Sequence, residues 1–171
     1  MSKITNCIVN KDHSCIPIWF MRQAGRYLPE FRKIRSENSD FVKLCLNSDL
    51  SSEITLQPLK RFNLDAAIIF SDILMIPYGL GQNVKFDKNK GPILSEFDLD
   101  IFLSNDKESF TNKLKPIYQA ITKTRKNLDK NKSLISFVGA PWTLAIYMLG
   151  LKKNKDELDF EKLEKKKLEL E

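Results

Sequence analysis

Residues 64–70, Leu-Asp-Ala-Ala-Ile-Ile-Phe, form a short and nearly continuous apolar run after the polar Asn63. A run of this length predicts a buried strand, and such runs are typical of parallel strands that are covered on both faces. Similar runs occupy residues 16–21 and 133–138, and segments with helical spacing separate the three runs. Strands that alternate with helices predict a parallel β/α architecture.

The rest of the chain divides into helices and loops. Pro58 predicts a kink or a break in one of the helices, and Pro116 either divides another or begins its second half. Ser39 is the candidate cap of the second helix, and Trp142 is expected in the core. We expect helices over residues 30–35, 40–46, 50–62, 105–128 and 142–150, a brief strand over 84–86, and loops over 22–29 and 71–81.

A functional motif follows each of the three predicted strands: Arg22 after the first, Asp72 after the second and Gly139 after the third. In β/α barrels the functional groups come from the carboxyl ends of different strands, so the spacing predicts one shared site. A full barrel usually needs about 250 residues, whereas this chain has 171. We therefore expect a (β/α)8 TIM barrel of which residues 1–171 are the N-terminal part, folded as a single domain of a larger enzyme.

The segment after the first run is rich in arginine. Residues 17–35 read Pro-Ile-Trp-Phe-Met-Arg-Gln-Ala-Gly-Arg-Tyr-Leu-Pro-Glu-Phe-Arg-Lys-Ile-Arg. Of the 28 basic residues in the whole chain, 22 are lysines and six are arginines, and four of the six arginines lie in this segment. Arginine offers a rigid fork of donors that matches a carboxylate or a phosphate. A solvated helical face is the ordinary interpretation of such a cluster, but Gly25 and Pro29 among the charges favour a binding loop for a polyanion.

Three segments resemble the uroporphyrinogen decarboxylase family: residues 17–35, residues 68–74 (Ile-Ile-Phe-Ser-Asp-Ile-Leu) and residues 139–148 (Gly-Ala-Pro-Trp-Thr-Leu-Ala-Ile-Tyr-Met). The resemblance implies a β/α barrel of about twice this length that forms homodimers and uses no cofactor. The implied activity is that of a lyase in haem and porphyrin biosynthesis. The implied substrate is uroporphyrinogen III, a cyclic tetrapyrrole with eight carboxylates, which loses its four acetate carboxyl groups as CO2 to give coproporphyrinogen III.

The resemblance also implies roles for residues of this chain. Asp72 matches the catalytic aspartate that accepts hydrogen bonds from the pyrrole N–H groups, although a lone aspartate after a strand is often a cap or a turn residue. Arg32 stays open between substrate binding and a surface ion pair near Glu30. The substrate-binding set implied by the match is Arg22, Gln23, Ala24, Arg26, Arg35, Asp72 and Tyr147. Gln23 and Ala24 lie beside the arginines, where we expect their backbone N–H groups to act as further donors.

Composition narrows the class of protein. The chain is 42% hydrophobic and 29% charged, with a formal charge of +6, which is the balance of a soluble globular protein without a membrane span. No nucleic-acid recognition motif accompanies the lysines, so we expect no nucleic-acid partner. The N-terminus lacks the apolar stretch of a secretory signal, which predicts a cytoplasmic protein. The three cysteines predict reduced thiols, and the single histidine, His13, leaves no multi-histidine metal site.

Two alternatives remain open at this stage. Residues 151–171 form a charged, helix-prone tail or insertion in place of the expected glycine-rich continuation. One alternative is an inactive truncated fragment that at most binds anions or its partner. The other alternative is a corrinoid-linked methyltransferase of the same superfamily, which is expected to carry a His/Cys metal site.

Overall fold

The computed structural model describes residues 1–87, 89–154 and 157–170. The chain forms two compact units, which are described separately here. The first unit comprises Met1–Asp72 and Leu114–Phe137, and the second comprises Ile73–Lys113 and Val138–Glu171.

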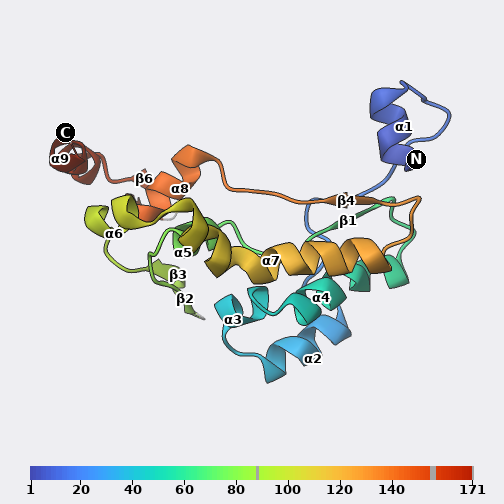
Figure 1. Ribbon diagram of the computed structural model, residues 1–171, viewed down its shortest axis with the longest axis horizontal. Coiled ribbons are helices and arrows are strands. Elements are labelled where there is room, and N and C mark those ends of the chain that lie inside the picture. Colours follow the sequence, from blue (N-terminus) through green and yellow to red (C-terminus); the bar gives the residue numbers. More distant parts are fainter. Residues whose placement is uncertain (88, 155–156, 171) are drawn as a thin grey trace. The chain divides into compact units, whose positions relative to one another are not determined.

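The first unit is built around two parallel strands. β1 (Ala66–Ile68) pairs with β4 (Ser133–Ile135) in the register Ala66 to Ser133, and Figure 1 shows the two strands side by side. Parallel strands need a long crossover connection, as the sequence predicts for a β/α architecture. Both strands are confirmed, but each is shorter than its apolar run. The helices of this unit are α1 (Lys3–Val9), α2 (Pro29–Glu37), α3 (Phe41–Cys45), α4 (Ser48–Arg61) and the C-terminal part of α7 (Lys107–Asn127).

The strand predicted at residues 16–21 is wrong, because this segment has no regular secondary structure. It still lies against the start of β1. The Ile18 carbonyl accepts a hydrogen bond from the Asp65 N–H at 2.8 Å, and the Ile18 N–H donates to Asp65 Oδ2 at 2.8 Å. A side-chain oxygen thus takes the place of a backbone carbonyl, and this breaks the repeating pattern of a strand pair.

Side-chain caps fix where the helices begin. Asp40, rather than Ser39, caps α3 by accepting a hydrogen bond from the Lys43 N–H, and Asn47 caps α4 in the same way. The break expected at Pro58 is wrong, since α4 continues through it to Arg61. α7 likewise runs through Pro116 without division.

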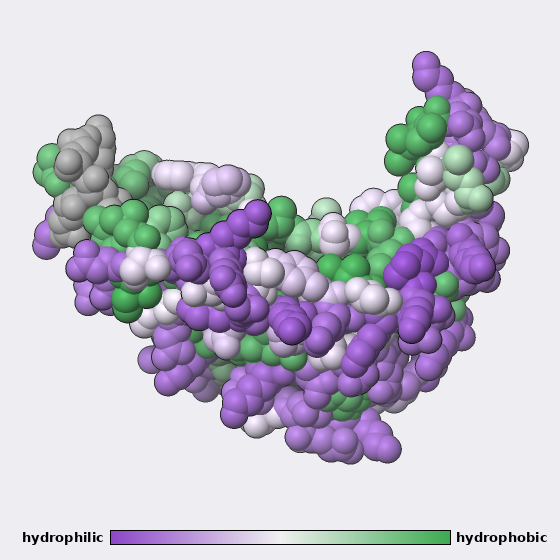
Figure 2. Space-filling view, viewed as in Figure 1, coloured by the Kyte–Doolittle hydropathy of each residue, from purple (hydrophilic) through white to green (hydrophobic). Residues whose placement is uncertain are grey.

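The core of the first unit lies between α2, α3 and α4. One apolar cluster of this core contains the buried side chains of Leu28, Phe31, Ile34, Leu44 and Ile54, and Ala24, Leu50 and Phe70 pack against it. Because Phe31 and Ile34 are three residues apart, they lie on one face of α2. The opposite side of α2 is mainly hydrophilic, as Figure 2 shows.

The second unit contains short helices and two hairpins. The strand expected at 84–86 is confirmed as β2 (Val84–Asp87), and it pairs with β3 (Gly91–Leu94). The predicted loop 71–81 contains a helix, α5 (Met75–Gly79), so that expectation is wrong for those residues. The other elements are α6 (Leu99–Ser104), the N-terminal part of α7, α8 (Pro141–Met148), β5 (Lys152–Asn154), β6 (Glu157–Leu158) and α9 (Phe160–Leu170).

Two expectations about the second unit have opposite outcomes. The helix-prone character of the charged tail is confirmed by α9. The core position expected for Trp142 is wrong, because its side chain is 55% exposed on α8.

The described residues show a mixed α/β fold but not a closed barrel. In the part of the chain that the structure describes, no helix combines the length and the apolar character needed to cross a membrane.

Candidate functional site

The arginine loop, defined here as residues 22–28, connects the extended segment 16–21 to α2. A turn closes it, because the Leu28 N–H donates to the Gly25 carbonyl at 3.0 Å, and the Tyr27 hydroxyl donates to the Gln23 carbonyl. Leu28 is buried in the core, and Pro29 then occupies the first turn of α2. Since proline fixes its backbone angle, the loop has a defined exit into the helix.

The guanidinium groups of Arg22 and Arg26 are exposed. Among the described residues, neither group has an ion pair or a hydrogen bond. Each arginine therefore offers its full set of donors to an anion. This is the arrangement expected of residues that bind a carboxylated ligand.

The other two arginines of the segment hold backbone carbonyls. Arg32 Nη1 donates to the Arg26 carbonyl at 2.8 Å and to the Tyr27 carbonyl at 3.3 Å. The ion pair considered between Arg32 and Glu30 does not form, because Glu30 pairs with Arg61 at 2.7 Å. The hydrogen bond from Arg61 holds the pKa of the Glu30 carboxyl below its usual value. In this structure Arg32 thus supports the arginine loop from α2.

Arg35 lies at the end of α2. Its Nη1 donates to the carbonyls of Asn38 and Ser39, the second at 2.8 Å, and its guanidinium carbon lies 5.3 Å from the centre of the Phe41 ring. A guanidinium over an aromatic face is a favourable cation–π contact. Both hydrogen bonds use Nη1, so Nε and Nη2 are the atoms with which Arg35 would meet a ligand.

Asp72 follows β1 by a short extended segment that is anchored at two successive residues. The Ile69 N–H donates to the Ile135 carbonyl at 3.0 Å, and the Phe70 N–H donates to Thr55 Oγ1 at 2.8 Å. The Phe70 ring packs edge-on against the rings of Phe31 and Phe41, at 5.9 and 5.8 Å between centres. This ring therefore packs against the apolar cluster of the first unit.

The structure brings Asp72 and Arg35 to the surroundings of one buried thiol. Cys45 is fully buried, and burial raises the pKa of its thiol far above the usual range. The charge of Asp72 raises this pKa further, whereas the charge of Arg35 lowers it. Asp72 and Arg35 both belong to the first unit, and their charges act on the same buried thiol in opposite directions.

Gln23 and Ala24 face inward rather than toward solvent. The Gln23 side chain is 4% exposed. Its Oε1 accepts a hydrogen bond from the Phe20 N–H at 3.0 Å, and its Nε2 donates to the Ala66 carbonyl at 3.0 Å. The Ala24 methyl group packs against the core. Their predicted role as backbone N–H donors does not involve these side chains and stays a prediction.

Tyr147 lies on α8 in the second unit, where it is half-buried. The helix begins with Pro141 in its first turn, directly after Gly139 and Ala140. A Cβ atom on Gly139 would lie 2.6 Å from Leu144 Cδ2, so this position needs glycine for close approach. The proposed role of Tyr147 near a substrate carboxylate stays a prediction.

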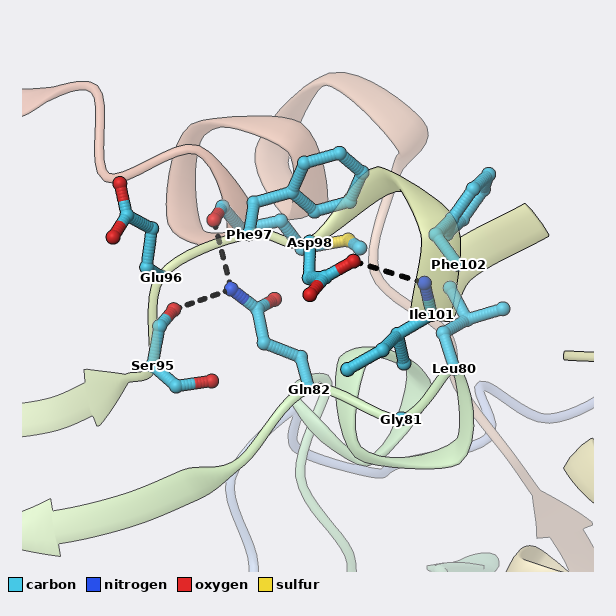
Figure 3. Close-up of a pocket in the computed structure, with 10 residues that line it drawn as sticks. Leu80, Gly81, Gln82, Ser95, Glu96, Phe97, Asp98, Ile101 and Phe102 are labelled. Carbon is cyan, nitrogen blue, oxygen red and sulfur yellow. Dashed lines mark hydrogen bonds between the residues drawn. The ribbon is translucent and has the colours of Figure 1, made fainter. Parts of the chain in front are cut away.

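A pocket in the second unit is too small for a tetrapyrrole. Figure 3 shows it between Gln82, Phe97, Asp98 and Phe102, and its volume is about 30 Å³. Ligand sites for larger organic molecules have volumes of roughly 300–1,000 Å³. The Gln82 Nε2 donates to the carbonyls of Ser95 and Met148, so this lining amide group is already hydrogen-bonded within the chain.

The sequence did not reveal the two buried polar side chains that hold the candidate site. Gln23 was expected to act through its backbone, and Thr55 was not singled out. The signal for Thr55 is a row of small polar residues on the buried side of α4, namely Ser51, Ser52 and Thr55. Such residues on a buried helical face bond to neighbouring backbone groups.

Comparison with known proteins identifies the family. The model described as "Uroporphyrinogen decarboxylase (URO-D)" matches residues 1–168. The chain belongs to the uroporphyrinogen decarboxylase family. It is 46% identical over 134 residues to the uroporphyrinogen decarboxylase of Brucella ovis and 47% identical over 134 residues to that of Brucella anthropi. Each match covers 78% of this chain and 39% of the relative, so the chain spans well under half the length of these relatives.

A solved structure shares the fold of this family member. A methyltransferase from Methanosarcina mazei superposes with a TM-score of 0.64, over 94% of this chain and 50% of that protein. The two sequences are 13% identical. At this identity the likeness shows the fold and carries no argument about the reaction.

Proposed function

We propose that these 171 residues are the N-terminal part of a (β/α)8-barrel uroporphyrinogen decarboxylase. The full-length enzyme, defined here as this chain continued to the length of its curated relatives, removes the four acetate carboxyl groups of uroporphyrinogen III as CO2 and gives coproporphyrinogen III. The observation that carries this proposal is the family match over residues 1–168, which includes the arginine loop and Asp72.

Arg22 and Arg26 bind substrate carboxylates in this proposal. An unpaired carboxylate is strongly disfavoured in a low-dielectric cleft, and each charge-assisted hydrogen bond contributes roughly 1.5–3 kcal/mol. The exposed guanidinium groups of these residues support the assignment. Arg35 adds a third positive charge through Nε and Nη2, and the backbone N–H groups of Gln23 and Ala24 supply further donors.

Asp72 is the catalytic residue. Protonation of a pyrrole carbon makes the substrate its own electron sink, so the proposed reaction runs without a cofactor. The bond between the methylene carbon and the carboxylate then breaks, its electron pair moves into the ring, and CO2 leaves. A proton added to the methylene carbon completes the methyl group, and loss of the proton first placed on the ring carbon restores the neutral pyrrole. A fixed carboxylate beside the pyrrole N–H groups stabilises the cationic intermediate, because it is oriented before the charge develops.

Tyr147 completes the binding set by donating its hydroxyl hydrogen to a substrate carboxylate. This assignment rests on the family resemblance of residues 139–148. From the same resemblance we propose that the chain folds as part of a single barrel domain, and that the full-length enzyme is a cytoplasmic homodimer.

The two rival functions make different demands on the chain. A corrinoid-linked methyltransferase is expected to carry a His/Cys metal site, and the arginine loop is unnecessary for it. An inactive fragment needs no continuation of the barrel. Reading the coding frame beyond residue 171 separates these possibilities, since an enzyme requires further strands and a stop codon supports the fragment.

Product analysis tests the proposed activity. The full-length enzyme is incubated with uroporphyrinogen III without oxygen, and the products are oxidised and separated by their number of carboxyl groups. We expect porphyrins with seven, six and five carboxyl groups as intermediates and a product with four. A substrate that keeps all eight carboxyl groups would refute the proposal.

A further inference from the structure

Gln23 is the most strongly held side chain of the arginine loop. It is 4% exposed, and its amide bonds to two backbone groups that lie in different segments of the first unit. Phe20 belongs to the extended segment before the loop, and Ala66 is the first residue of β1. A backbone N–H can only donate and a carbonyl can only accept, so these two partners fix the orientation of the amide.

The side chain thereby takes the place of a strand neighbour. On one side, Ala66 is paired with Ser133 of β4. On the other side, the Asp65 N–H donates to the Ile18 carbonyl. The Ala66 carbonyl, one residue further along, accepts a hydrogen bond from Gln23 Nε2 rather than from a backbone N–H. The arginine loop is therefore attached directly to the strand that leads to Asp72.

We infer that Gln23 is a positioning residue, whose side chain holds the arginine loop in fixed register with the strand that carries Asp72. This inference rests on the proposed function, because it assigns the loop to carboxylate binding and Asp72 to the pyrrole N–H groups. Both groups must meet one rigid macrocycle at the same time. A misplacement of about 1 Å in such a site costs on the order of 100-fold in rate, so a buried clamp between the two elements serves catalysis.

A matched control distinguishes positioning from the general cost of changing a buried glutamine. Gln57 on α4 is 2% exposed, and neither its Oε1 nor its Nε2 has a hydrogen-bond partner among the described residues. Gln57→Leu removes a side-chain amide that is buried to a similar degree, but it breaks no hydrogen bond. We expect Gln57→Leu to change KM for uroporphyrinogen III less than twofold, whereas Gln23→Leu raises it tenfold or more.

A mutant cycle in the full-length enzyme tests the mechanism. A background that carries both Arg22→Ala and Arg26→Ala lacks the loop arginines through which Gln23 acts, so Gln23→Leu should change KM by less than threefold there. Interaction between residues appears as such non-additivity. A Gln23→Leu effect on KM that stays tenfold in this background would overturn the inference, as would an unchanged KM in a folded Gln23→Leu variant.

Gln23→Glu gives a second readout if the leucine variant does not fold. An ionised carboxylate would repel the Ala66 carbonyl, whereas a protonated carboxyl restores both a donor and an acceptor. The KM defect of Gln23→Glu relative to the parent should therefore shrink at least fivefold as the pH falls from 8 to 6, because burial raises the pKa of such a group. A pH-independent defect would contradict the inference.

The same assays separate failure of this inference from failure of the proposed function. Decarboxylation by the parent enzyme tests the function before any variant is compared. A parent that decarboxylates while the Gln23 variants behave like the Gln57 control overturns only the positioning role. A parent that neither turns over uroporphyrinogen III nor binds its fluorescent oxidised form, uroporphyrin III, overturns both.

Discussion

Replacing Thr55 with valine is expected to loosen the segment that leads to Asp72. The Thr55 side chain is 1% exposed, and its Oγ1 accepts a hydrogen bond from the Phe70 N–H at 2.8 Å while it donates to the Ser51 carbonyl at 2.7 Å. Valine has nearly the same shape but no hydroxyl, so Thr55→Val leaves the Phe70 N–H without its partner. An unsatisfied buried donor costs about 1–3 kcal/mol.

The magnitude can be read locally by amide hydrogen exchange. The Phe70 N–H is only partly buried, so we expect a cost near 1.4 kcal/mol, which corresponds to roughly tenfold faster exchange of this amide. Thr55→Ser keeps the hydroxyl and removes one methyl group, with a cost of about 0.8 kcal/mol that comes from packing. The serine variant should therefore leave the Phe70 amide protected.

Thr124→Val is the matched control for this experiment. Thr124 is fully buried, but its Oγ1 is hydrogen-bonded to the Ser52 side chain at 3.1 Å rather than to the backbone of the segment before Asp72. It should leave Phe70 exchange unchanged. Wild-type protection of the Phe70 amide in Thr55→Val, or equal loss of protection in Thr124→Val, would refute the reasoning.

Further predictions concern the charged groups and the chain itself. Asp72→Asn in the full-length enzyme should lower kcat by orders of magnitude without loss of folding, as steady-state assays and circular dichroism can measure, because the neutral amide cannot stabilise a cationic pyrrole. Arg26→Ala should raise KM without changing thermal stability, whereas Arg35→Ala should raise KM and also lower Tm, since Arg35, unlike Arg26, donates to backbone carbonyls through its side chain; Arg26→Lys should preserve KM only in part. The Ile18 N–H and the Lys3 ammonium hold the pKa of the Asp65 carboxyl below its ordinary value of 3.8. The contribution of the Asp65 carboxylate to stability is therefore present above pH 3.8 and is lost as the pH falls through the lower, folded-state pKa. In that acidic range, urea titrations should give the same free energy of unfolding for wild type and Asp65→Ala. The 171-residue chain expressed alone should aggregate and form no coproporphyrinogen, because the apolar side chains of residues 16–21 are largely exposed; a soluble and active 171-residue protein would contradict this.

The parallel strands could be predicted from sequence because their signal is local. The apolar runs at 64–70 and 133–138 identify β1 and β4, whose residues 66–68 and 133–135 are paired in the structure. The run at 16–21 looks the same, but its outcome depends on a partner distant in sequence. Asp65 supplies a side-chain oxygen where a strand would need a carbonyl, and no local pattern encodes that exchange.

The sequence predicts the charged residues of the candidate site, but it does not predict the side chains that hold the backbone around them. The arginine cluster predicts that Arg22 and Arg26 bind anions, which stays a prediction, and the same composition does not reveal that Arg32 bonds the backbone of the loop. The Gln23 side chain contacts Ala66, which is 43 positions further along the chain, and the Thr55 side chain contacts Phe70, which is 15 positions further along. Such contacts follow from packing, and propensity alone does not encode them.

The stoichiometry of CO2 release tests the central claim most directly. Uroporphyrinogen III labelled with ¹³C in its four acetate carboxyl groups is incubated with the full-length enzyme, and the labelled CO2 is counted against the product. The account predicts four labelled CO2 molecules for each coproporphyrinogen formed, and a large loss of this yield in Asp72→Asn. Labelled carboxyl groups that remain on the macrocycle, or equal CO2 release by Asp72→Asn, would contradict it.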